Sequence, residues 1–305
     1  MSAQTVLFDA PGPKAKRRHT LLTVLGALLM VALAWLVLNK MAQAGQLEAA
    51  KWTPFLTPTA WTSYLIPGII GTLTASVISV VLAGIFGLVF GLGRLSGQRW
   101  VRLISGLVVE FFRAVPVLLM MYFAFNVYSR NGVFLATLNP LMAVVTALTL
   151  YNGSVIAELV RSGVHSLPKG QSEAGLSIGL TPGQTLRSIQ LPQALVAMLP
   201  ALMGQLVVVI KDSALGYGIT YMELLSWSKT LGSAYANTVP AYIVAAVLFI
   251  MFNYAMTKLA AAVERQLKRR RVTAAPLTNT MPNIVQGHAE PGDVQAENAE
   301  DAQTL

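Results

Sequence analysis

Charged side chains inside apolar stretches are the residues of this sequence whose chemistry is most informative. A charge at the centre of a membrane helix costs about 2.5–3.5 kcal/mol on insertion scales, so such residues need partners or a function. Residues three apart share one helix face and can form an ion pair. These positions are candidates for a transport pathway or for structural ion pairs: Glu110 with Arg113, Glu158 with Arg161, and Lys211 with Asp212.

Catalytic chemistry has little support in the residue types available. The chain has no cysteine, which excludes disulfides, thiolate metal sites and cysteine nucleophiles. The three histidines, His19, His165 and His288, are too scattered to suggest a metal cluster. There is no glycine-rich phosphate-binding loop. We therefore expect this chain to be no enzyme and to bind no metal or cofactor itself.

The elements that carry these residues are predicted to be membrane helices. Of the 305 residues, 54% are hydrophobic and only 11% are charged, whereas a soluble domain has about 25% charged residues. About 20 apolar residues cross a bilayer. The sequence predicts an all-α integral membrane protein with six transmembrane helices, at 20–38, 63–93, 104–127, 140–161, 193–212 and 239–262.

Positive charge indicates the orientation of these spans. The net charge of +9 could favour nucleic acid, but in a membrane protein basic residues mark cytoplasmic loops, so we expect no nucleic-acid partner. Both termini are therefore predicted to be cytoplasmic. The inner side would carry Lys14, Lys16, Arg17, Arg18, Arg94, Arg99, Arg102, Arg161, Lys169, Arg187, Lys258, Arg265, Lys268, Arg269, Arg270 and Arg271, and the outer side Lys40, Lys51, Arg130 and Lys229.

The two ends of the chain differ from its centre. A basic arm (1–19) precedes the first span and an external linker (20–62), a core follows (63–262), and a basic end with an acidic tail closes the chain (263–305). The first span with Ala42-Gln43-Ala44 resembles a cleavable signal peptide, but its apolar run exceeds the usual length, which favours a retained anchor. The composition of 272–305 predicts disorder.

Glycine and proline predict how the spans pack and bend. Small residues allow close approach of membrane helices, and Gly84, Gly87 and Gly91 offer such a surface on the second span. We favour ordinary packing within one bundle over dimerisation for this spacing. Pro67 suits a helix start or a kink, and Pro116 is expected to bend the third span.

A polar, broken segment between the fourth and fifth spans is too irregular to cross a bilayer. A helix is predicted from Lys169 to Ile178, with Gly179 as its left-handed cap. Thr181 would cap a second short helix that ends before Pro192. Neither helix is long enough to be stable alone, and their small and apolar residues suit either docking on a partner or lying on the membrane.

The spacing within this segment resembles a known family. Glu173-Ala174-Gly175, three residues, Gly179, nine residues and then Ile189-Gln190-Leu191-Pro192 are similar to the EAA loop of ABC-importer permeases, in which alanine usually stands where this chain has Gly175. Further stretches over 63–262 resemble motifs of polar amino acid uptake permeases, above all those of glutamate type. They are Gly68-x-x-x-Thr72-Leu73, Glu110–Pro116, Ala157–Gly163, Leu167–Gly175 and Lys211–Leu215.

This resemblance implies a fold, a mechanism and partners. The first span would precede a five-helix permease core in a bacterial cell membrane, and the two short helices would be cytoplasmic coupling helices. An extracytoplasmic binding protein would deliver the amino acid, glutamate or a relative, to a pair of permease subunits. A pair of ATPase subunits would hold ATP and Mg and grip the EAA loop. The residues implied in that contact and its hinge are Glu173, Ala174, Gly175, Gly179, Ile189, Leu191 and Pro192.

Two other classes of protein fit the sequence less well. An ion-coupled secondary transporter would show inverted repeats with broken spans and acids near the midplane, and no such symmetry is present. A membrane-embedded enzyme would need a constellation of nucleophile, base or metal ligands, which the spans lack.

Overall fold

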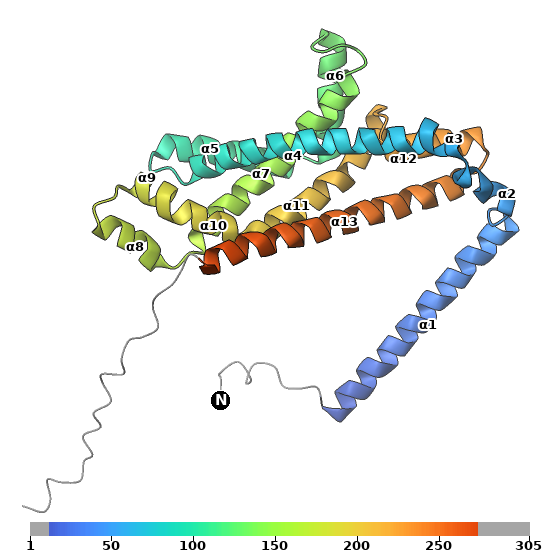
Figure 1. Cartoon of the computed structure of the whole chain (residues 1–305), viewed down its shortest axis with the longest axis horizontal. Coiled ribbons are helices and arrows are strands. Elements are labelled where there is room, and N and C mark those ends of the chain that lie inside the picture. The colour runs from blue at the N-terminus through green and yellow to red at the C-terminus, as the bar shows by residue number, and fades with distance from the viewer. Residues whose placement is uncertain (1–11, 274–305) are drawn as a thin grey trace, which may run out of the picture. The chain divides into compact units, whose positions relative to one another are not determined.

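The computed structural model describes residues 12–273, and every regular element in that range is a helix (Figure 1). The predicted all-α class is confirmed for this part of the chain. Five helical stretches are long and apolar enough to cross a membrane. They are α1 (Pro13–Gln43), Pro58–Arg94 ending in α4 (Ile66–Arg94), α7 (Asn139–His165), Leu199–Ile219 with α11 (Leu199–Asp212) and η5 (Ser213–Ile219), and Thr238–Leu259 within α13 (Thr238–Thr273).

The predicted third span, 104–127, is not one straight helix. It is split into α5 (Arg99–Ala114) and α6 (Val117–Asn131), which are bent by 100° to each other. Pro116 has no N–H to continue α5, and a proline disfavours helical backbone at the residue before it. Val115 is accordingly extended, with φ −83° and ψ 127°. The expected bend is confirmed, and a sixth span exists only if the bent pair is one.

The fifth span begins later than predicted because Pro192 does not end a helix. α9 (Pro182–Thr185) continues through a π-helical turn, η4 (Leu186–Gln190), into α10 (Leu191–Ala197), and the break comes at Met198. The wider turn precedes the proline and accommodates its missing N–H. The same device, η3 (Trp61–Leu65), precedes Pro67, so that proline also lies within a continuous helix.

The close packing of α4 on α7 forms the centre of the bundle. A methyl group at Gly87 would lie 2.4 Å from Ile156, and one at Gly91 would lie 2.8 Å from Val160, whereas Gly84 faces open space. Glycine at two of these three positions thus lets the helix axes approach. The prediction that this spacing serves packing within the bundle is confirmed.

The external linker of the sequence-based prediction folds into short helices that pack on the last third of the chain. These are α2 (Ala49–Trp52), η2 (Thr53–Leu56) and α3 (Pro58–Ala60), and their partners are α12 (Leu224–Ala234) and the start of α13. Phe55, Leu224 and Leu231 are buried in the shared cluster. Lys51 joins the two parts by donating from Nζ to the carbonyl of Ala236 (2.8 Å).

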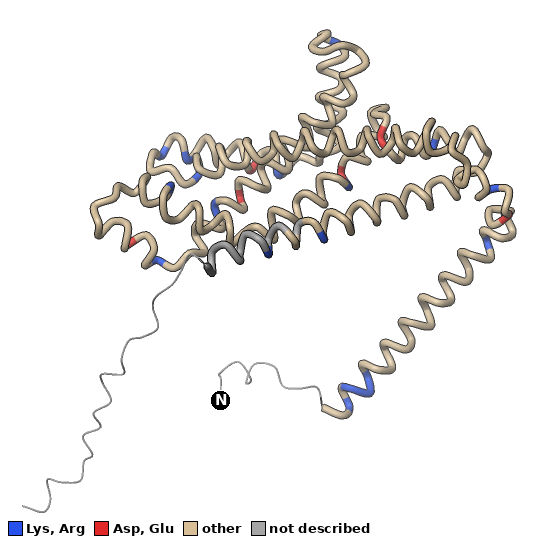
Figure 2. The backbone as a smooth tube through the Cα atoms, viewed as in Figure 1, with Lys and Arg blue, Asp and Glu red and all other residues tan. Residues whose placement is uncertain are grey.

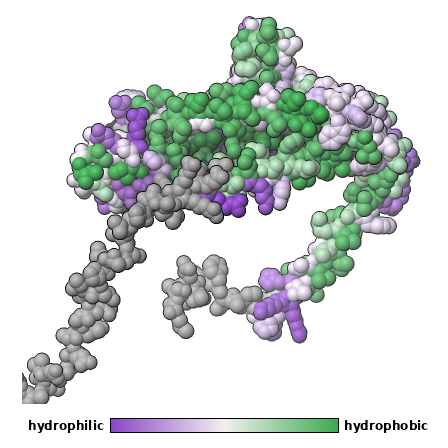
Figure 3. Space-filling view, viewed as in Figure 1, coloured by the Kyte–Doolittle hydropathy of each residue, from purple (hydrophilic) through white to green (hydrophobic). Residues whose placement is uncertain are grey.

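The helix α1 differs from the other long helices because none of its residues is buried. Its surface is apolar along most of its length and charged mainly near its ends (Figures 2 and 3). The chain divides into two units, Met1–Ala262 and Val263–Leu305. The first eleven residues of the predicted basic arm, and all but the start of the predicted acidic tail, lie outside the described residues.

Candidate functional site

The polar segment after α7 folds into two short helices that meet at a turn. We call the two helices and the turn between them the elbow. α8 (Lys169–Ser177) ends at Gly179, whose φ of +85° suits glycine and few other residues. The N–H of Leu180 donates to the carbonyl of Gly175 (3.1 Å), which closes the helix end. Thr181 then caps α9 in a capping box with Gln184. The predicted caps at Gly179 and Thr181 are confirmed.

The outer face of α8 is exposed and mixes an acid with apolar side chains. Glu173 and Ala174 are exposed, as are 47% of Leu176 and 75% of Ile178. Gly175 is buried on the opposite face. An exposed apolar face on a helix too short to be stable alone is typical of a surface that binds a partner protein.

The remaining residues of the predicted loop connect the elbow to the membrane helices. Ile189 and Leu191 are half-buried and Pro192 is exposed. Gln193 of α10 donates from Nε2 to Oε1 of Gln171 in α8 (2.8 Å). Beyond it, Met198 lies against Gly163 of α7, where a methyl group would be 2.8 Å from the methionine sulfur. These contacts connect α8 through α10 to α7.

The predicted ion pairs of α5 and α7 form one cluster around a residue that neither pairing predicted. Arg94, at the end of α4, contacts Glu158 (2.6 Å) and Glu110 (3.1 Å). Arg113 lies 3.7 Å from each of these two carboxylates, and Arg161 pairs with Glu158 at 2.5 Å. Both predicted pairs are present, and Arg94 is only 13% exposed. The cluster joins α4, α5 and α7.

Lys211 and Asp212 do not belong to this cluster. They are the last two residues of α11, directly before the 3₁₀ helix η5. Neither forms an ion pair within the described part of the chain. Lys211 is exposed and Asp212 is half-buried. The structure therefore brings four of the six predicted charged residues together and leaves these two apart.

A second polar hub joins the start of α4 to the segment before α12. The backbone N–H of Leu224 donates to Thr72 Oγ1 (3.1 Å), and the Tyr221 hydroxyl donates to the carbonyl of Gly71 (2.7 Å). A methyl group at Gly71 would lie 2.4 Å from the carbonyl oxygen of Met222. The motif that begins at Gly68 thus serves a close backbone contact.

A fully buried carboxylate completes this second hub. Glu223 caps α12 by accepting from the N–H groups of Leu225 and Ser226, both at 2.7 Å. Burial raises the pKa of Glu223 to about 6, and these hydrogen bonds partly oppose the shift. Burial, followed by the charge of Glu223, raises the pKa of Tyr221 to about 12. The hub is a structural cap with two titratable groups, Glu223 and Tyr221.

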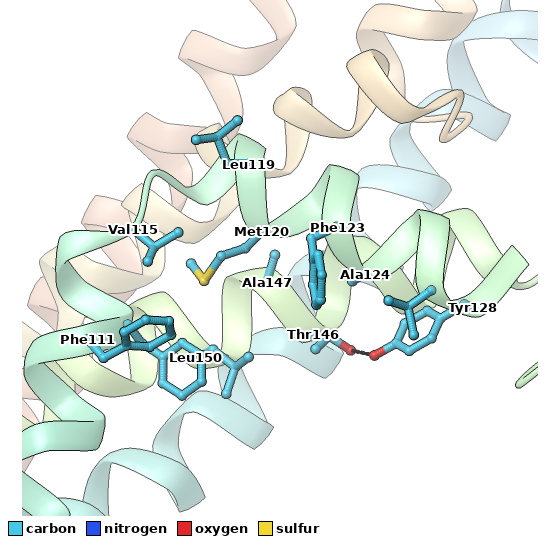
Figure 4. A pocket seen from close by; sticks show the side chains of 12 residues that line it. Phe111, Val115, Leu119, Met120, Phe123, Ala124, Tyr128, Thr146, Ala147 and Leu150 are labelled. Carbon is cyan, nitrogen blue, oxygen red and sulfur yellow. Dashed lines mark hydrogen bonds between the residues drawn. The ribbon is translucent and has the colours of Figure 1, made fainter. Parts of the chain in front are cut away.

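A cavity of about 610 Å³ lies at the bend between α5 and α6, facing α7 (Figure 4). Its walls are apolar, and the polar contact drawn there joins the hydroxyls of Tyr128 and Thr146 (2.9 Å). No charged side chain lines it among the described residues. Among the described residues it offers no charged partner for the ammonium and carboxylate groups of an amino acid.

A family model connects this geometry to known proteins. The model is described as "Binding-protein-dependent transport system inner membrane component", and it matches residues 83–269. That range includes the elbow and the whole charged cluster. The chain belongs to this family. It is a transport permease, and the predicted family is confirmed.

Individual relatives of this permease agree with the family model. The glutamate transport system permease protein GluD of Corynebacterium glutamicum is 47% identical over 227 residues, which cover 74% of this chain and 83% of that protein. The probable glutamine ABC transporter permease protein GlnP of Bacillus subtilis is 32% identical over 205 residues, 66% of this chain and 93% of that protein.

Solved structures share the fold of the permease. A crystal structure of an amino acid ABC transporter with histidines matches with a TM-score of 0.63 and 27% identity, over 70% of this chain and 98% of that one. An inward-facing structure of the MetNI methionine ABC transporter matches with a TM-score of 0.59 and 20% identity, over 69% and 99%. The second likeness supports the fold alone.

Two residues important to the permease's polar sites were missed by sequence reasoning. Arg94 was assigned only to an inner loop, although it lies in the cluster with Glu110 and Glu158. Glu223 was not singled out. Its position directly before an apolar helix was the available signal, because an acid there can act as an N-cap.

Proposed function

We propose that this permease is the membrane subunit of an ATP-driven importer of polar amino acids, with glutamate or a close relative as substrate. The identity of 47% to a glutamate permease supports the substrate class. An extracytoplasmic binding protein delivers the amino acid, and a pair of separate ATPase subunits binds ATP and Mg. The chain lies in a bacterial cell membrane with both termini in the cytoplasm.

In this proposal the elbow is the surface to which the ATPase binds. The observation that carries it is the exposed face of Glu173, Ala174, Leu176 and Ile178 on a helix hinged at Gly179. Closure of the ATPase pair moves α8, and α10 passes the movement to α7 through the contact at Gly163. The access of the pathway then alternates between the two sides of the membrane, a reciprocal coupling between two sites.

The charged cluster and the bent pair complete the proposed mechanism. Arg94 ties α4 to α5 and α7, so we assign the pairs Glu110–Arg113 and Glu158–Arg161 to transmission between helices. The bent pair α5–α6 counts as one span, which makes six. α6 exposes Leu119, Tyr122 and Phe123, an apolar surface suited to a second permease subunit. Lys211 and Asp212 are proposed to line the outer end of the pathway.

The test is uptake of labelled amino acids into vesicles that hold the complete transporter. Glu173→Lys reverses the charge of the gripped face, and Gly179→Pro cannot adopt the φ of +85°. Both variants are expected to abolish uptake and substrate-stimulated ATP hydrolysis while the protein remains in the membrane. Normal transport by both would reject the docking role. Uptake that prefers an unrelated solute over glutamate, glutamine and aspartate would reject the substrate class.

A further inference from the structure

The contact between the two helices of the elbow is tighter than a methyl group allows. If Gly175 carried a Cβ, that atom would lie 2.6 Å from Thr185 Cγ2, 2.8 Å from Thr185 Oγ1 and 3.0 Å from Ile189 Cδ1. Real Cβ atoms essentially never approach other atoms more closely than 3.0 Å. Gly175 therefore permits an approach of α8 to α9 that alanine would prevent.

Rotation of Thr185 does not remove this conflict. A β-branched side chain in a helix is stiff about χ1. Any other staggered rotamer of Thr185 still leaves a heavy atom in at least one of the two positions that lie under 3 Å from the added Cβ. Thr185 is buried, and its hydroxyl has no hydrogen-bond partner within the described part of the chain. Thr185 is therefore held by packing, and Gly175 is one of the residues against which it packs.

The other contacts of the elbow hold its ends, and the angle between α8 and α9 depends on the contact between Gly175 and Thr185. Gly179 makes the turn possible, and the capping box of Thr181 fixes only the start of α9. The hydrogen bond from Gln193 to Gln171 ties α8 to α10 at the other end of the helix. Between these two points, Gly175 and Thr185 decide how closely the helices lie.

We propose that Gly175 and Thr185 are a matched pair of positioning residues that sets the angle between the two helices of the elbow, and with it the orientation of the exposed face of α8. This inference rests on the proposed function of the elbow. It explains why this chain departs from the alanine of the related motif: the glycine is required by the threonine that faces it.

Gly175→Ala is the first variant of the test. The added methyl forces the helices apart, and overpacking of this kind is expected to lower uptake and substrate-stimulated ATP hydrolysis about tenfold in the complete transporter. The double variant Gly175→Ala with Thr185→Ala removes both atoms that the methyl meets. It breaks no hydrogen bond of the described part of the chain, because the Thr185 hydroxyl has no partner there. It is expected to recover most of the loss.

The angle itself can be measured without the ATPase. The chain has no cysteine, so cysteines introduced at Ser177 and Arg187 are unique positions for a pair of spin labels. The label-to-label distance is expected to increase in Gly175→Ala and to return in the double variant. Gly170→Ala is the matched control for this distance, because it makes the same change in the same helix where no atom lies within 4 Å.

The outcomes separate the two proposals. An unchanged label-to-label distance in Gly175→Ala overturns the matched pair. So does a double variant whose uptake and substrate-stimulated ATP hydrolysis are no higher than those of the single variant. A changed distance with normal coupling also overturns it, while the proposed function stands if Glu173→Lys still abolishes uptake. If Gly175→Ala does not insert into the membrane, insertion of the double variant supports the pair and its failure contradicts it.

Discussion

At the scale of single residues, position rather than charge type decides what each ion pair contributes. Arg94 has two carboxylate partners at 2.6 and 3.1 Å and is 13% exposed, whereas Arg113 is 37% exposed and reaches the same carboxylates at 3.7 Å. Hydrogen bonds to charged groups strengthen as water is excluded, and exposed pairs contribute little. Arg94 is therefore the centre of the cluster and Arg113 its edge.

This difference predicts the effect of removing each arginine. Arg94→Ala is expected to destabilise the permease by about 1–3 kcal/mol, because two acids lose their closest shared partner. Arg113→Ala, the matched control in the same cluster, is expected to cost roughly 0.2–1 kcal/mol. Thermal unfolding of the two purified variants in the same detergent shows which of them loses more stability. Equal losses would mean that the cluster does not depend on its buried centre.

Glu223 predicts a dependence of stability on pH. Its pKa is raised in the folded state from 4.5 to about 6, so the folded protein keeps the proton to higher pH than the unfolded chain. The contribution of Glu223 to the free energy of unfolding is therefore fully present below pH 4.5. It falls by about 2 kcal/mol as the pH rises through 6. Glu223→Gln cannot titrate, so its stability relative to the native protein should increase over that window. A difference that is independent of pH would contradict this assignment.

At the scale of elements, the sequence predicted the positions of helices better than their joints. Hydropathy marks long spans because lipid demands apolar surface, and the caps at Thr181 and Gly179 follow from local backbone chemistry. The prediction that a helix ends before Pro192 was wrong, because a π-helical turn accommodates the proline within a continuous helix. Arg94 was missed because its acids lie 16 and 64 residues away, beyond any local pattern.

The interface of α4 with α7 provides a test at this scale. Gly87→Ala would place a methyl 2.4 Å from Ile156, so we expect a loss of about 1–3 kcal/mol in stability from overpacking. Gly84→Ala changes the same helix where no atom lies within 4 Å, and it should be neutral. The unfolding temperatures of both variants decide the matter. Similar temperatures for the two variants would show that the helices do not depend on close contact there.

At the scale of the whole molecule, α1 differs from the permease core in its burial. It has no buried residue, although its sequence is as apolar as that of any span. A solved transporter chain is matched over 98% of its own length by only 70% of this chain. Helices in lipid associate through the contacts they make, since lipid tails exert no hydrophobic force between them. α1 therefore adds little to the stability of the core.

This argument predicts that the core folds without α1. The linker contacts begin at Gln46, whose carbonyl accepts from Trp52 Nε1 (2.9 Å). Replacing residues 1–44 with a cleavable signal sequence keeps that linker on the same side of the membrane. The free energy of unfolding of the remaining chain is expected to change by less than about 1 kcal/mol, because no buried contact is lost. Thermal unfolding and amino acid uptake of this variant are compared with those of the full chain. A large drop in unfolding temperature would place α1 within the core, whereas lost uptake at unchanged stability would assign it a role in assembly with a partner.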